Sequence, residues 1–178
     1  VRRASGDLLD ADGPVLDAYG GIGLFAATLP MREAIVVEGS PSACADARLN
    51  IATGRVVRTM FEQWRPTPVR LAVADPARSG LGRDSADVLA ATGAERVVLV
   101  SCDPVAMARD VSLLAAHGYR HGSSEVFDLF CDLEASDAQA DFSTLYAIAR
   151  NGIARAGIAP LSPAKRGATC FMIARHER

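Results

Sequence analysis

Short, continuous apolar runs alternate with helical patterns from residue 14 to about residue 127, and this alternation limits the fold more than any other feature. Continuous runs indicate strands that are buried on both faces, which is typical of a parallel sheet covered by helices. Repeated strand–helix units with right-handed crossovers predict an α/β, doubly wound, Rossmann-like and mostly parallel sheet. The expected strands are 15–19, 34–38, 55–60, 71–75, 96–100 and 119–128, and the expected helices are 22–29, 41–51, 85–92 and 105–117.

The end of the chain is less regular. After Cys131 the periodicity is weak and alanines are frequent, although 142–154 could form a helix and 169–174 a final strand. We therefore expect residues 1–130 to form the catalytic domain. Residues 131–178 are then an atypical tail that could complete the sheet.

Composition fits one ordinary globular domain. The chain has 178 residues, of which 49% are hydrophobic, and no apolar run approaches the roughly 18 residues that a membrane span needs. The formal charge of −2 differs from that of a stand-alone nucleic-acid binder. The start shows no signal peptide, and its first residue, valine, suggests a fragment. Four widely spaced cysteines predict neither a metal site nor a disulfide framework, so we expect reduced thiols and a cytoplasmic protein.

A glycine-rich turn follows the first expected strand, with the sequence DAYGGIG over 17–23. Glycines such as Gly21 and Gly23 let the backbone approach a ligand, although many such turns are only tight turns. Glu38 ends the next strand, where a carboxylate can accept hydrogen bonds from both hydroxyls of a ribose, unless it is merely a solvated acid. The loop lacks a Walker lysine and a complete G-x-G-x-x-G pattern. It therefore resembles an S-adenosylmethionine loop more than an NAD loop.

Two further motifs end later strands. Asp75 is followed by Pro76, which stiffens the turn at the edge where doubly wound folds bind ligands. Cys102 stands in the tetrapeptide SCDP over 101–104, beside the start of a helix. Asp-Pro after a strand is often only a turn, and a lone cysteine there is often an inert buried thiol. The helix start and the neighbouring motifs make Cys102 a candidate nucleophile instead.

Together these motifs resemble those of the RNA uracil-C5 (5-methyluridine) methyltransferase family, in order and in spacing. The matching segments are 17–23, Glu38, the DPARSG of 75–80 and the SCDP of 101–104, and FDLF at 127–130 also looks like the family's next block. The resemblance covers roughly residues 14–130. It implies the class I S-adenosylmethionine-dependent methyltransferase fold.

The resemblance also implies a reaction. Cys102 would add to C6 of uracil, so that C5 can take a methyl group from S-adenosylmethionine, and a base would then remove the C5 proton. Tyr19, Glu38 and Asp75 would line the methyl-donor site, with Glu38 on the ribose. The implied substrate is a tRNA or an rRNA, with no DNA, membrane or metal involved. The family's N-terminal RNA-binding domain is missing from this chain.

The chain departs from the family pattern in two ways. Within the matching segments, Gly20, Ala77 and Leu24 replace a cysteine, a proline and an asparagine. The larger departure follows Phe130. The family's P-x-T-x-H-V-E block, whose glutamate is the proton acceptor, is absent. By count Asp137 occupies that position and Glu134 is the nearest glutamate. A reading-frame error near codon 131 or true divergence would each explain the difference.

Two other functions stay open at this point. One is a methyltransferase that acts on nitrogen or oxygen, with a structural Cys102. The other is a non-catalytic module that binds S-adenosylmethionine or RNA.

Overall fold

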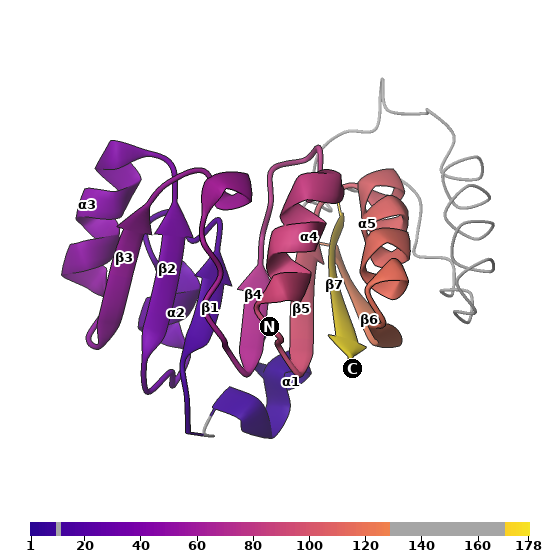
Figure 1. Cartoon of the computed structure of the whole chain (residues 1–178), viewed down its shortest axis with the longest axis horizontal. Coiled ribbons are helices and arrows are strands. Elements are labelled where there is room, and N and C mark those ends of the chain that lie inside the picture. Colours follow the sequence, from indigo (N-terminus) through magenta and orange to yellow (C-terminus); the bar gives the residue numbers. More distant parts are fainter. Residues whose placement is uncertain (10–11, 129–169) are drawn as a thin grey trace.

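A seven-stranded, mostly parallel sheet organises the protein (Figure 1). The structure is a computed structural model that describes residues 1–9, 12–128 and 170–178. The strand order is β3-β2-β1-β4-β5-β7-β6, in which only β7 runs antiparallel to its neighbours. The strands are β1 Val15–Ala18, β2 Ala34–Glu38, β3 Gly54–Arg58, β4 Leu71–Ala74, β5 Arg96–Ser101, β6 Arg120–Asp128 and β7 Cys170–Glu177.

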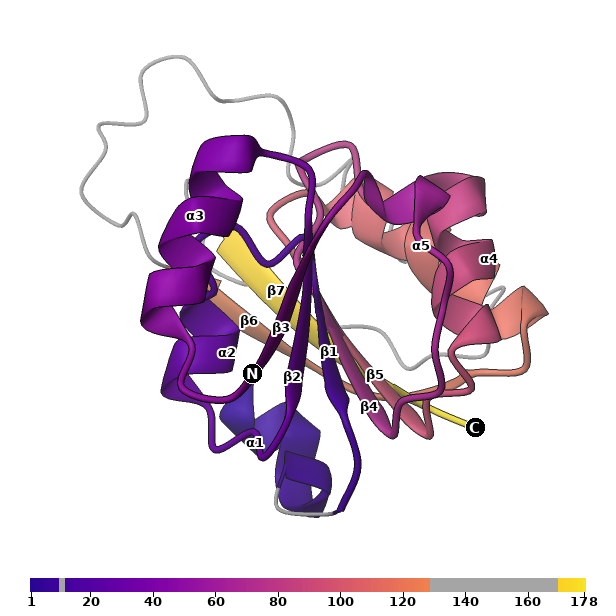
Figure 2. The same cartoon turned by 60° about the vertical axis from the view of Figure 1, so that its left-hand side comes forward.

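Helices cover both faces of the sheet (Figure 2). On one face lie α2 Leu24–Thr28 and α3 Pro41–Asn50, with α1 Arg2–Ser5 and the short helix η1 Gly6–Leu9 near the lower end of the sheet. On the other face lie α4 Gly82–Ala91 and α5 Pro104–Ala116, with η2 Phe61–Gln63 beside them. Within the described part of the chain, no helix is long and apolar enough to cross a membrane.

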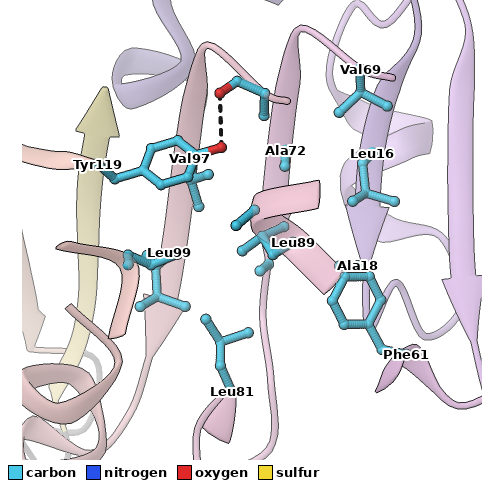
Figure 3. Packing of buried hydrophobic residues seen from close by; sticks show 14 of the residues in the cluster. Leu16, Ala18, Phe61, Val69, Ala72, Leu81, Leu89, Val97, Leu99 and Tyr119 are labelled. Carbon is cyan, nitrogen blue, oxygen red and sulfur yellow. Dashed lines mark hydrogen bonds between the residues drawn. The ribbon is translucent and has the colours of Figure 1, made fainter. Parts of the chain in front are cut away.

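The continuous apolar runs are explained by two cores. Along each central strand successive side chains point to opposite faces, so neighbours such as Leu71 and Ala72 enter different clusters. The larger cluster lies under α4, α5 and η2 and includes Leu89, Leu99 and Tyr119 (Figure 3). The smaller one lies under α2 and α3. Because both faces are buried, an alternating polar pattern cannot occur.

The expected doubly wound fold is confirmed, with differences in detail. The helix expected over 22–29 is only Leu24–Thr28. Gly21 and Gly23 have φ values of +53° and +79°, which keep the chain out of a right-handed helix until Leu24. The strand expected at 169–174 is present as β7, inserted between β5 and β6. The helix proposed for 142–154 lies outside the described residues.

Candidate functional site

The predicted site residues gather at one edge of the sheet, where the parallel strands end (Figure 1). The glycine loop follows β1, Glu38 ends β2, Asp75 follows β4 and Cys102 follows β5. In the strand order β2-β1-β4-β5 these ends are neighbours, although they are far apart in the sequence. Asp137 and Glu134, the predicted bases, lie outside the described residues.

Tyr19 begins the glycine loop in an unusual conformation. Its φ of +59° makes it the only described non-glycine residue with a positive φ. Its hydroxyl donates a hydrogen bond to Ser85 Oγ at 2.8 Å, and its ring packs on Phe61 with 5.1 Å between centroids. These contacts fix the aromatic ring and offset the cost of a left-handed backbone, which is of order 1–2 kcal/mol.

Glu38 connects β2 to the glycine loop. Its carboxylate accepts a hydrogen bond from the backbone N–H of Gly21 at 3.0 Å and another from that of Ser40 at 2.6 Å. A side chain built on Gly21 would point into open space, so the backbone is accessible there. A carboxylate has about four lone-pair positions, so Glu38 keeps acceptor capacity for hydroxyl groups of a ligand. Glu38 is therefore an organised acceptor rather than a solvated loop acid.

Asp17 is a buried acid that the sequence reasoning placed in the loop motif but not in the site. Its side chain is fully buried in β1, where Oδ2 accepts a hydrogen bond from the Ala26 N–H at 3.1 Å and Oδ1 has no partner among the described residues. Burial raises the pKa of Asp17 to about 7, and the nearby negative charge of Asp75 contributes to the rise. The sequence did contain a signal for this residue, because an aspartate within an otherwise apolar strand must be buried.

Asp75 lies directly after β4, next to the ends of β1 and β5. Its backbone N–H donates to the Ala18 carbonyl at 3.3 Å, which continues the parallel ladder and fixes the start of the loop. The residue is half-buried, and burial raises the pKa of its carboxyl above the ordinary value. None of the hydrogen bonds within the described residues goes to this carboxylate.

Cys102 is a free, partly exposed thiol at the start of α5. The helix itself is capped by the next residue, Asp103, whose Oδ1 accepts hydrogen bonds at 2.9 Å from the N–H groups of Val105 and Ala106. Ser101 Oγ accepts from the Asp103 N–H at 3.2 Å and closes the turn. The tetrapeptide thus builds a rigid strand-to-helix turn that holds the thiol at the edge of the sheet.

A buried network joins the loop after Asp75 to α5. The carboxylate of Asp110 accepts hydrogen bonds from the N–H groups of Leu81 and Gly82 at 2.6 and 3.3 Å. Arg109 binds both the Asp110 carboxylate, at 2.8 Å, and the carbonyl of Ser79. Sequence reasoning missed this pair, although an Arg-Asp dipeptide within an apolar helical pattern was a signal for it. The loop that carries Asp75 is therefore fixed to the helix that follows Cys102.

A second link joins the same two motifs. Arg78 Nε lies 3.6 Å from Asp103 Oδ2, and the arginine side chain is 81% exposed. Exposed ion pairs contribute only about 0–1 kcal/mol, so this contact orients Arg78 more than it stabilises the fold.

Solved structures place this architecture in a known class. The strand order with one antiparallel strand is that of class I S-adenosylmethionine-dependent methyltransferases. A tRNA (uracil-54, C5)-methyltransferase of Pyrococcus abyssi, solved with S-adenosyl-L-homocysteine, matches 98% of this chain and 36% of its own, with a TM-score of 0.64 and 19% identity. The N-methyltransferase NodS of Bradyrhizobium japonicum matches 98% of this chain and 90% of its own, with a TM-score of 0.63 and 13% identity. These similarities establish the fold.

Relatives found by sequence indicate which kind of methyltransferase the chain is similar to. An uncharacterized RNA methyltransferase of Streptomyces coelicolor is 39% identical over 127 residues, which are 65% of this chain and 28% of that protein. The 23S rRNA (uracil(1939)-C(5))-methyltransferase RlmD of Pseudomonas fluorescens is 34% identical over 145 residues, 74% of this chain and 32% of that protein. No protein-family model matches the chain. The resemblance drawn from the motifs is confirmed: the chain is homologous to RNA methyltransferases, including uracil-C5 enzymes, and spans about a third of their length.

Proposed function

We propose that this chain is the methyl-transferring portion of an RNA uracil-C5 methyltransferase that uses S-adenosylmethionine. One observation carries the proposal: the glycine loop with Glu38, the Asp75 loop and Cys102 occupy neighbouring strand ends on one edge of the sheet. Two relatives that are 34% and 30% identical to the chain act on uracil C5 of 23S rRNA, by their names. The proposed substrate is a tRNA or an rRNA.

The glycine loop fits the proposed cofactor. Gly21 offers an open backbone, and Glu38 keeps acceptor capacity for the hydroxyl groups of a ribose. Asp17 has a buried oxygen with no partner among the described residues, and a positive charge near it would stabilise the ionised carboxylate. S-adenosylmethionine supplies an electrophilic methyl group on a sulfonium when it is bound. Tyr19, Gly21, Gly23, Glu38 and Asp75 are the residues that we expect to line its site.

Cys102 carries the covalent step in this proposal. Uracil C5 is a weak nucleophile, so the Cys102 thiolate adds to C6 and converts the ring to an enolate whose C5 attacks the methyl group. A base then takes the C5 proton, the C5=C6 double bond re-forms and the thiolate leaves. The rigid turn at 101–104 supports this role because it holds the sulfur at the edge that the cofactor loop also occupies.

Trapping on 5-fluorouridine RNA tests this function. The fluorine at C5 blocks release, so the protein, S-adenosylmethionine and a fluorinated 23S rRNA or tRNA transcript should give a covalent complex on a denaturing gel. Cys102→Ala should abolish both the complex and methyl transfer. Cys44→Ala is the matched control, since Cys44 is the other described cysteine with a placed side chain and is buried in α3, and it should still form the complex.

The other outcomes separate the competing functions. Methyl transfer that persists in Cys102→Ala would refute the nucleophile and favour a nitrogen or oxygen methyltransferase. Cofactor binding in calorimetry without methyl transfer to either RNA would favour a non-catalytic binding module. Transfer to only one of the two transcripts would assign the substrate class.

A further inference from the structure

Asp75 lies between the two halves of the proposed site. β4 is paired with β1 on one side, through Ala18 and Ala74, and with β5 on the other, through Ala74 and Leu99. The glycine loop follows β1 and Cys102 follows β5, so the residue directly after Ala74 stands between the methyl-donor loop and the thiol. In the proposed reaction the thiol is on C6 and the methyl donor faces C5. In the proposed complex, a side chain between them would face this part of the ring.

Each of the other carboxylates at the ends of these strands already accepts hydrogen bonds from the backbone. Glu38 accepts two backbone N–H groups, from its own turn and from the glycine loop. Asp103 accepts the two N–H groups that begin α5. Asp17 is fully buried beneath the loop and bonded to α2, so it cannot reach a substrate ring. Among the carboxylates at the ends of β1, β2, β4 and β5, Asp75 is the one that is partly exposed and accepts no hydrogen bond from the described residues.

Asp110 binds the far end of the loop that begins with Asp75. Its carboxylate accepts hydrogen bonds from the N–H groups of Leu81 and Gly82. Arg109 is engaged with Asp110 and with the carbonyl of Ser79. Arg78 is directed to Asp103. Arg78 and Arg109 thus contact partners other than Asp75.

We propose that Asp75 is the base that removes the C5 proton after methylation. The inference rests on the proposed function. The Asp75 carboxylate takes the proton from C5, the electrons of the C5–H bond form the C5=C6 double bond, and the C6–S bond breaks with its electron pair on sulfur. The products are 5-methyluracil, a free Cys102 thiolate and a protonated Asp75, which returns its proton to water.

The electrostatics of the carboxyl agree with this role. Burial raises the pKa of Asp75, and a carboxylate with a raised pKa is a stronger base near neutral pH. Asp75 would supply this base from the start of the loop that follows β4.

Single-turnover methylation of uridine transcripts tests the proposal. Unmodified 23S rRNA and tRNA transcripts are mixed with methyl-labelled S-adenosylmethionine and separated on a denaturing gel. Asp75→Asn keeps the side chain's shape but cannot take a proton. It should accumulate a labelled RNA–protein adduct and release product at least ~100-fold more slowly than the unaltered protein, as expected for loss of a general base. Asp75→Glu should restore part of the release.

Other results would overturn the proposal. If Asp75 only positions uracil or the cofactor, Asp75→Asn should form less adduct on both uridine and 5-fluorouridine RNA, with no slowed release. Adduct that accumulates in Asp137→Asn or Glu134→Gln instead would assign the base to the segment predicted from the family count. Absence of trapping on 5-fluorouridine RNA by the unaltered protein would refute the proposed function, and this inference with it.

Discussion

Gly80 offers a sensitive test of the network that joins the Asp75 loop to α5. A Cβ at this position would lie 2.2 Å from Asp110 Oδ2 and 2.5 Å from Arg109 Nη2, and the backbone has φ +79°. Gly80→Ala must therefore pay for a left-handed alanine and also displace the Asp110 carboxylate. Gly93→Ala is the matched control, because Gly93 has φ +70° but nothing within 4 Å of its Cβ.

The expected magnitudes differ clearly. A left-handed alanine costs about 1–2 kcal/mol, which is the whole effect expected for Gly93→Ala. Displacing Asp110 also deprives the N–H groups of Leu81 and Gly82 of their acceptor, at about 1–3 kcal/mol for each buried donor. Gly80→Ala should therefore lower the free energy of unfolding by about 3–8 kcal/mol, a large part of the roughly 5–15 kcal/mol typical of a domain.

Urea titration measures the difference. Trp64 is the only tryptophan and is 6% exposed, so its fluorescence reports unfolding directly. A double-mutant cycle with Asp110→Ala adds a second measurement: the alanine at Gly80 should cost much less once the carboxylate is gone. If Gly80→Ala and Gly93→Ala differ by less than about 1 kcal/mol, or the cycle is additive, the network does not constrain this loop.

Two buried titratable groups predict opposite pH effects. The pKa of Asp17 is raised to about 7, so the folded state holds this proton more strongly than the unfolded state, and stability should fall as pH rises from about 4 through 7. Asp17→Asn should remove this dependence, and equal pH slopes in urea titrations of the two proteins would contradict it. The pKa of His176 is lowered to about 3, first by burial and then by His121, whose ring lies 5.3 Å away edge to face. Stability should therefore fall as pH decreases from 6.5 toward 3, and His176→Gln should reduce this acid sensitivity, whereas an unchanged acid midpoint would argue against a buried neutral histidine.

The local features of the fold were readable from the sequence because they depend on neighbouring residues. Runs such as 71–74 and 96–100 predicted strands buried on both faces, and the two cores on either side of the sheet confirm this. Ser40 and Pro41 predicted the start of α3, where Ser40 Oγ accepts the Ala43 N–H. The motifs at Glu38, Asp75 and Cys102 were recognisable because each one ends a strand.

Strand pairing and hydrogen bonding between distant parts of the sequence could be known only from the tertiary structure. The sequence does not show that β7 inserts antiparallel between β5 and β6, since its register with Ser101 depends on packing across some 70 intervening residues. The sequence also does not show that Asp110 accepts hydrogen bonds from the end of the Asp75 loop. This contact forms only because α5 packs beside α4 in the folded protein. Strand-end position predicted which residues could meet at the site. Hydrogen bonding in the folded state decided which carboxylates are engaged and which one, Asp75, accepts no hydrogen bond within the described residues.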